Sequence, residues 1–116
     1  MPVIVESATD TRRNWLIEGQ RIHRLGHRSP VYSPGVQEMT DIPARLAQMD
    51  QLGVDIQVLF PSFFNMAVLA HADAEAALCR SYNRWLADIS AESGGRLRWA
   101  IVPPFHQLDV ALEELE

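Results

Sequence analysis

The pattern of apolar positions becomes regular after residue 40. Apolar residues first recur at the spacing of one helical face, at Ile42, Leu46, Met49 and Leu52. Gly53 follows, and glycine ends a helix in the left-handed conformation at little cost. The next residues, Val54–Phe60, are branched and aromatic and alternate between two faces. The pattern therefore predicts a helix that Thr40 or Asp41 caps, followed by a strand.

The same succession of helix and strand then repeats. A helix is predicted from about Ala72 to Ala91, ended by Ser93–Gly95. Its apolar stripe consists of Leu78, Tyr82, Trp85, Leu86 and Ile89. Arg96–Pro104 reads as a second strand that two prolines stop, and a last helix begins near Leu108. Strands separated by helices pair in parallel, so this part predicts an α/β fold.

The first forty residues follow another pattern. Val3–Ser7 and Asn14–Ile22 are β-like runs, and the polar residues between them suit a hairpin loop. Glu18–Gly19 suits a tight turn inside the second run. His23–Gln37 holds two glycines and two prolines among polar residues, which is typical of a loop.

We therefore expect two regions, an N-terminal hairpin and loop region over residues 1–40 and βα units over residues 41–116. The expected order of elements is hairpin-α-β-α-β-α. Two parallel strands do not make a stable sheet alone, because parallel sheets are buried on both faces and contain several strands. The chain is either a slice of a larger α/β protein or a small unit that completes itself by association.

Composition excludes several classes of protein. Apolar residues make up 47% of the chain and the net charge is −5, which suits a soluble globular protein. The ten basic residues are all arginine and are scattered, so they form no nucleic-acid-binding stripe. A single cysteine excludes an internal disulfide, and no apolar run reaches the ~20 residues of a membrane span. With no secretion signal at Met1, we expect a cytoplasmic protein.

Three segments carry a resemblance to a known family. They are "RLAQMDQLGVDIQVLFPS" (Arg45–Ser62), "CRSYNRWLADIS" (Cys79–Ser90) and "RLRWAIVPPFHQLDVALEELE" (Arg96–Glu116). In order and spacing they resemble the amidohydrolase-related family that includes the aminocarboxymuconate-semialdehyde decarboxylase type. The likeness covers about Ile42 to Glu116.

The resemblance implies a metal-dependent (β/α)₈ barrel, of which Val54–Phe60 and Leu97–Val102 would be the second and third strands. It implies hydrolysis or nonoxidative decarboxylation of small, often aromatic, carboxylated substrates by a divalent metal, usually zinc. The family holds its metal with a His-x-His pair, two later histidines and a late aspartate. No His-x-His occurs in this sequence. The expectation is therefore a partial barrel segment, a fragment that is inactive and binds no metal alone.

Active sites of such barrels lie at the carboxyl ends of the strands. By that rule the substrate-pocket candidates are Ser62, Phe63 and His106. Each has a plainer interpretation: no nucleophile elbow surrounds Ser62, Phe63 suits core packing, and His106 suits an exposed residue before the last helix.

His23 and His27 are weak metal-ligand candidates. Their His-x₃-His spacing would place two imidazoles on one helical face, but Gly26 and Pro30 disfavour a helix there. Two surface histidines in a loop are the plainer interpretation.

Two further functions compete with the barrel fragment. One is a small α/β binding module whose apolar stripes drive homo-oligomerisation, without catalysis. The other is a small enzyme that uses His23, His27 and His106. Cys79 is expected to be a buried, inert thiol, and Asp50 and Asp55 to bond backbone or an arginine such as Arg45.

Overall fold

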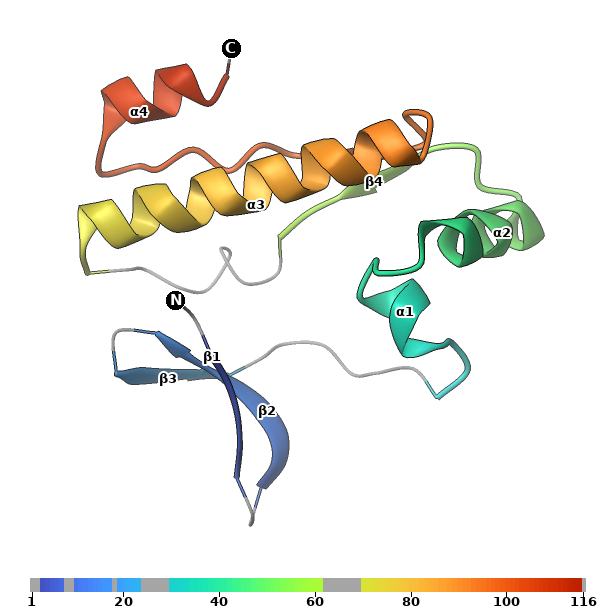
Figure 1. Ribbon diagram of the computed structural model, residues 1–116, viewed down its shortest axis with the longest axis horizontal. Coiled ribbons are helices and arrows are strands. Elements are labelled where there is room, and N and C mark those ends of the chain that lie inside the picture. The colour runs from blue at the N-terminus through green and yellow to red at the C-terminus, as the bar shows by residue number, and fades with distance from the viewer. Residues whose placement is uncertain (1–2, 8–9, 18, 24–29, 62–69, 116) are drawn as a thin grey trace. The chain divides into compact units, whose positions relative to one another are not determined.

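The computed structural model describes residues 3–7, 10–17, 19–23, 30–61 and 70–115. These residues fall into two compact units. The first lies within residues 3–23, and the second comprises residues 30–61 and 70–115. Figure 1 shows their helices and strands.

The first unit is an antiparallel sheet with the strand order β1-β2-β3. Its strands are β1 (Val3–Ser7), β2 (Asp10–Ile17) and β3 (Gln20–His23). The predicted tight turn is present, because Ile17 pairs with Gln20 and Gly19 has φ 76°. The predicted hairpin loop is too long, since Asp10–Arg13 belongs to β2. An antiparallel strand tolerates polar residues on a face that meets water.

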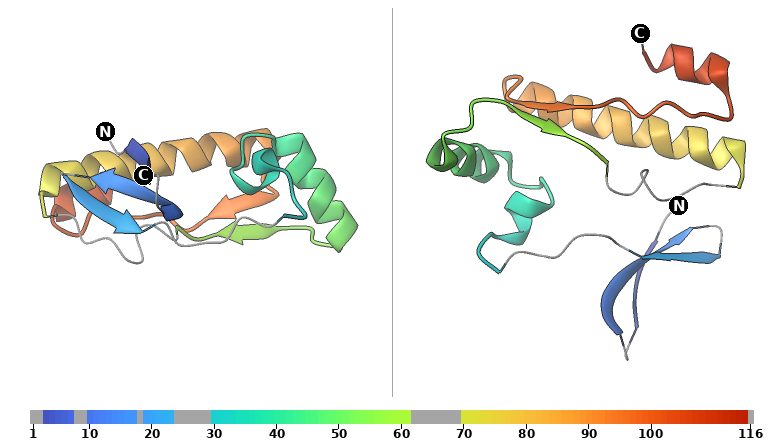
Figure 2. Two further views of the ribbon diagram at one scale, coloured as in Figure 1. Left: turned by 90° about the horizontal axis from the view of Figure 1, so that it is seen from below. Right: turned by 180° about the vertical axis from the view of Figure 1, so that it is seen from behind.

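The second unit contains four helices and two strands among its described residues. They are α1 (Pro34–Gln37), α2 (Ile42–Leu52), β4 (Gln57–Leu59), α3 (Ala72–Glu92), β5 (Leu97–Trp99) and α4 (Leu108–Glu113). Strands β4 and β5 pair in parallel, with Val58 opposite Arg98. The α/β class is confirmed. Figure 2 shows β4 and β5 side by side, with α3 running along them.

Both parallel strands are shorter than predicted. The ladder ends at the bond from Ala100 N to Leu59 O, 3.0 Å long. Beyond it, the N–H and C=O groups of Val102 bond to the side chain of Asn83 instead of to a strand. The predicted loop over His23–Gln37 also contains α1, which Ser33 caps and which begins with Pro34. Serine followed by proline is a known helix-start signal.

Local chemistry explains both ends of α2. Asp41 is the N-cap, and its Oδ1 accepts a hydrogen bond from Ala44 N at 3.0 Å. At the other end Gly53 takes φ 67°, and its N–H donates to Asp50 O. The next residue, Val54, donates to Met49 O, so the helix end keeps its carbonyls satisfied. These two residues fix where the helix begins and ends.

Gly53→Ala is expected to lower the free energy of unfolding by about 1 kcal/mol, because an L-residue is strained at this positive φ. A Cβ at this position would meet nothing within 4 Å, so the loss comes from the backbone alone. Gly53→Asn is the matched control. Its free energy of unfolding should fall by less than that of Gly53→Ala, since asparagine tolerates the left-handed region. Urea unfolding measures both variants, and equal midpoints for alanine and asparagine would contradict this account.

The core of the second unit joins α2, α3 and β5. Its buried members are Ile42, Met49, Leu86, Ile89 and Leu97. Leu46, Val54, Leu59, Tyr82 and Trp99 are partly buried against it. The helix-facing side of the sheet is therefore covered.

The predicted stripe of α3 is only partly right. Leu86 and Ile89 are buried, but Trp85 is 46% exposed. The buried face instead runs through Ala76, Cys79, Asn83, Leu86 and Ile89. Among the helices that the structure describes, none, α3 included, has the length and apolar character needed to cross a membrane.

The other side of the sheet is open. Val58 at the centre of β4 is 52% exposed, and its neighbours in the alternation, Ile56 and Phe60, are 50% and 72% exposed. Gln57 and Leu59, which point the opposite way, are half-buried. We call Ile56, Val58 and Phe60 the open sheet face. The parallel sheet thus has helices on one face, and on the other the exposed apolar side chains of the β4 segment beside the exposed Arg98 of β5.

Candidate functional site

The carboxyl ends of β4 and β5 lie at one edge of the sheet because the strands are parallel. Phe60 and Pro61 follow β4 there, and Ala100–His106 follows β5. Of the three predicted pocket residues, Ser62 and Phe63 lie outside the described part of the chain. His106 is the one whose position the structure gives.

His106 is held by Glu75, from the first turns of α3. One carboxylate oxygen, Oε2, accepts a hydrogen bond from the His106 main-chain N–H at 3.0 Å and lies 2.8 Å from its Nδ1. The Glu75 side chain is 13% exposed and that of His106 is 48% exposed. A carboxylate at Nδ1 fixes the orientation of the ring and leaves Nε2 as the nitrogen for other contacts.

The next residue is held in the same way. Gln107 Nε2 donates to Asp73 Oδ1 at 2.9 Å, and Gln107 is the N-cap of α4. Two carboxylates of the first α3 turns therefore fix the residues that lead into α4. Sequence reasoning placed His106 at the strand end but missed its partner Glu75, which lies 31 residues away.

A pair of histidine and carboxylate can hold or move a proton, and its histidine can bind a metal. For metal binding, three or more ligands are needed. Within the described ranges, no group of three or more His, Cys, Asp or Glu side chains is arranged to hold a metal ion. The pair is thus a partial site that needs further groups to act on a substrate.

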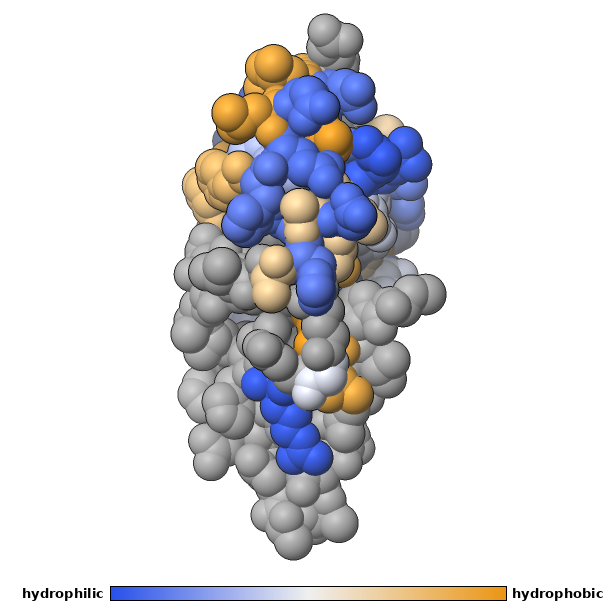
Figure 3. Space-filling model, turned by 90° about the vertical axis from the view of Figure 1, so that its left-hand side faces the viewer, coloured by the Kyte–Doolittle hydropathy of each residue, from blue (hydrophilic) through white to orange (hydrophobic). Residues whose placement is uncertain are grey.

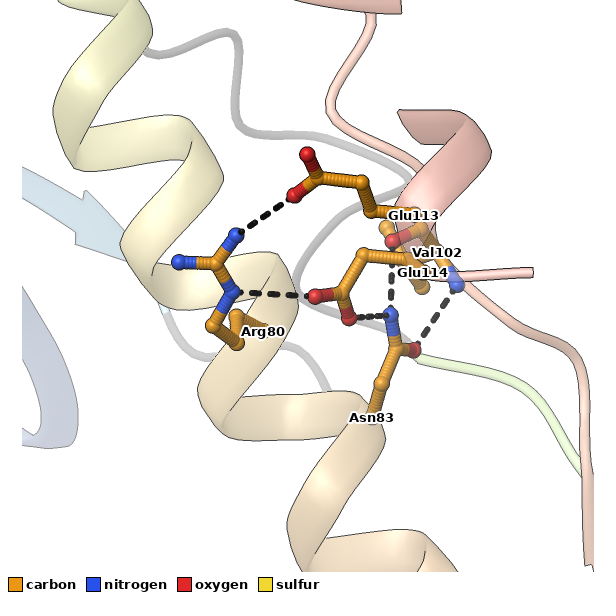
Figure 4. Close-up of polar contacts among 5 residues, drawn as sticks. All are labelled: Arg80, Asn83, Val102, Glu113 and Glu114. Carbon is orange, nitrogen blue, oxygen red and sulfur yellow. Dashed lines mark hydrogen bonds and ion pairs between the residues drawn. The ribbon is translucent and has the colours of Figure 1, made fainter. Parts of the chain in front are cut away.

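A second polar cluster joins α3 to α4 (Figure 4). Asn83 Nδ2 donates to Val102 O at 3.1 Å and to Glu114 Oε2 at 3.0 Å, and Asn83 Oδ1 accepts from Val102 N at 3.0 Å. Arg80 Nε donates to Glu114 Oε1 at 3.1 Å. Asn83 is buried, so its amide carries three bonds that water cannot replace.

This cluster sets the local electrostatics. The hydrogen bond from Asn83 and the charge of Arg80 hold the pKa of Glu114 below its usual range, against the opposing effect of burial. Burial, with the charges of Glu75 and Glu114, raises the pKa of Cys79 to about 11. Cys79 is a free thiol that is 1% exposed, so the prediction that this thiol is buried is confirmed.

Arginines join the elements at the opposite edge of the sheet. Arg96 pairs with Asp50 at 2.7 Å, and it also donates to the carbonyls of Asp55 and Val54. Asp50 therefore bonds an arginine, as predicted, but that arginine is Arg96 and not Arg45, which was the example suggested. Because Arg96 lies beyond α3 in the sequence, local spacing could not identify it.

Arg45 instead joins α1, α2 and β4. Its guanidinium donates to Gln57 Oε1 at 2.8 and 3.2 Å, and to Val36 O and Gln48 Oε1 at 3.4 Å each. These acceptors are neutral oxygens held by the fold itself. We assign Arg45 a structural role.

The weak metal candidates are not brought together by anything that the structure describes. His23 is the last residue of β3, where its Cα pairs with that of Asn14. His27 lies outside the described residues.

Comparisons with known proteins add no family to this picture. No protein-family model matches the sequence, and a search of curated proteins finds no match.

Proposed function

We propose that this chain forms part of the wall of a metal-dependent amidohydrolase-like barrel, a hydrolase or decarboxylase of small carboxylated or aromatic substrates. In this proposal β4 and β5 are neighbouring barrel strands, and His106 lies at the substrate end of the barrel. The chain alone is expected to have no turnover. The proposal rests on the order of the three resembling segments and on one structural observation.

That observation is the open sheet face. A (β/α)₈ barrel surrounds parallel strands with helices and fills its interior with branched side chains. The unit from β4 to β5 has helices on one side and Ile56, Val58 and Phe60 exposed on the other. In a complete barrel these three side chains would meet those of other strands. Their burial would remove the cost of leaving them in water.

The zinc that this family uses does not fit the described residues by themselves. The donor set near the strand ends is His106 with Glu75, and no third ligand accompanies it within the described part of the chain. We therefore derive no catalytic step through a metal. In the proposal the metal-binding side chains come from other strands.

A charged residue on the open sheet face tests the proposal. Two proteins are expressed side by side: the 116-residue chain, and the product of the genomic reading frame that contains this sequence. Both are assayed with zinc on small aromatic carboxylates. We expect turnover only from a longer frame, and none from the chain alone. Phe60→Asp should abolish turnover of the longer protein, because it buries an unpaired charge in the barrel. The same change should alter the stability of the short chain by only about 0.5 kcal/mol.

Val31→Asp is the control, since Val31 is 78% exposed and lies outside the sheet. It should leave the longer protein active. Zinc-dependent turnover by the short chain, or full activity of the longer Phe60→Asp protein, would overturn the proposal.

A homo-oligomeric binding module is the second candidate, and the outer surface of α4 favours it. Leu108, Leu112 and Leu115 are 72%, 66% and 63% exposed and share one helical stripe. Figure 3 shows apolar side chains near the top of the view, where α4 lies, with hydrophilic side chains among them. Sedimentation of the short chain tests this second candidate. A dimer that Leu112→Glu dissociates would support the binding module. A monomer at micromolar concentration would contradict it.

A further inference from the structure

Helix α4 is fixed to α3 at both of its ends by polar contacts. At its start, His106 and Gln107 bond to Glu75 and Asp73, and we call these four residues the hinge. At its other end, Glu114 bonds to Arg80 and Asn83, and we call these three residues the latch. Both sets of partners belong to α3.

Apolar contacts add little to this attachment. Ala111 is the buried residue of α4 and offers a single methyl group, and Val110 beside it is half-buried. Leu108 and Leu112 point to solvent. The main core cluster consists of residues of α2, α3 and β5 and does not include α4. A segment with few buried apolar contacts opens at a lower free energy than the core does. Helix α4 can therefore separate from α3 while the core stays folded.

Cys79 lies between the hinge and the latch. Glu75, Cys79 and Asn83 follow one another at four-residue spacing, so they share one face of α3. Glu75 belongs to the hinge and Asn83 to the latch, and the charges of Glu75 and Glu114 both act on the thiol. Cys79 is 1% exposed. The thiol therefore lies on the face of α3 that bonds to both ends of α4, between Glu75 and Asn83.

We propose that α4 is an acid-released flap: protonation of Glu114 opens the latch, α4 swings on the hinge, and the face of α3 that carries Cys79 becomes accessible. The inference concerns the chain by itself and does not depend on the proposed function. Protonation removes the charge that Arg80 and Asn83 stabilise. The hinge keeps the hydrogen bond that the His106 main-chain N–H donates to the Glu75 carboxylate.

The charges around Glu114 favour its ionised form. From α3, Arg80 and Arg84 face it with positive charge, and Cys79 is a neutral thiol at ordinary pH. From α4 itself Glu113 is 71% exposed and pairs with Arg80 at 3.6 Å. The segment after β5 contributes the neutral main chain of Val102 through Asn83. The cations outweigh the one neighbouring carboxylate.

The direction of the pH effect follows from this. The native pKa of Glu114 lies below that of an unfolded glutamate. Its stabilisation of the closed flap is therefore complete above the unfolded value, about 4.3. It is lost as the pH falls through the lower native pKa. Acid opens the flap, and neutral pH closes it.

The labelling rate of Cys79 measures the opening directly, because the chain has a single cysteine. The full chain reacts with 4,4′-dithiodipyridine between about pH 6 and pH 3, and the same chain in guanidinium gives the rate of the unprotected thiol at each pH. Their ratio is the protection factor. We expect it to fall roughly tenfold on acidification, because the closed flap then loses charge-assisted hydrogen bonds from Arg80 and Asn83. Far-UV circular dichroism should stay unchanged over that range.

Two neighbouring variants separate the latch from general charge effects. Glu114→Gln should lower the protection factor roughly tenfold at pH 6 and weaken its pH dependence. Glu113→Gln removes an exposed carboxylate from the next position and should keep the profile of the unchanged chain. A pH-independent protection factor in the unchanged chain would overturn the flap. So would matching profiles for the two variants, or loss of circular dichroism at the pH where Cys79 becomes reactive. If Glu114→Gln fails to fold, the unchanged chain and Glu113→Gln still decide.

Discussion

Leu97→Ala is expected to lower the free energy of unfolding of the second unit by about 2–5 kcal/mol, or to leave it unfolded. Leu97 is 0% exposed and belongs to the cluster of Ile42, Met49, Leu86 and Ile89. Alanine would remove apolar contacts to two helices at once and leave a cavity between them. Small domains have total stabilities of only about 5–15 kcal/mol, so this single change consumes much of the margin.

Leu112→Ala makes the same chemical change on the surface of α4, where the side chain is 66% exposed. Its cost should stay within about 0.5 kcal/mol. Urea unfolding followed by tryptophan fluorescence measures both variants. Equal costs would show that the core is not centred on β5. A large cost for Leu112→Ala alone would show that the α4 stripe is buried in an assembly.

The sequence predicted those elements whose signals are local. Asp41, Gly53 and the alternation that follows lie within about twenty residues, and they define α2 and β4 through bonds to their own neighbours. The tight turn at Gly19 was predictable for the same reason. The order of helices and strands follows from such signals, because each needs only a cap, a glycine or a period.

Features that depend on distant partners were not predictable from spacing. Asn83 interrupts the apolar pattern of α3, yet it is buried because it meets Val102 and Glu114, 19 and 31 residues further on. The same long-range bond ends β5 early. Glu75 as the partner of His106 is a third case. Sequence reasoning found the histidine by its place after a strand, and it had no signal for the carboxylate.

The sequence also did not show which face of the sheet the helices cover. The alternation of Val54–Phe60 showed two faces, but it did not show which one the helices would cover. The structure places the half-buried Gln57 and Leu59 toward the helices and leaves the more apolar face open. An apolar face opposite a helix layer is a property of the folded unit. The proposal of a barrel depends on it.

Asn83→Ala is expected to lower the free energy of unfolding by about 3 kcal/mol, because it leaves buried backbone groups without partners. The N–H and C=O groups of Val102 both lose their bonds, and Glu114 loses one of its two donors. Gln51→Ala, which removes an exposed amide from α2, is the control and should cost no more than about 0.5 kcal/mol. Urea unfolding at neutral pH gives both values.

Asn83→Asp separates the two roles of the amide. The carboxylate can still accept from Val102 N, but it cannot donate to Val102 O, and it places a second negative charge beside Glu114. At neutral pH Asn83→Asp should lower the free energy of unfolding by more than Asn83→Ala does, because two carboxylates then share one partly buried position. Protonation of either group restores a donor and removes the repulsion, so the difference between aspartate and alanine should shrink as the pH falls toward 4. If Asn83→Ala costs no more than Gln51→Ala, the amide does not hold α4 and the strand end to α3. In that case the latch would have to rest on Arg80 alone.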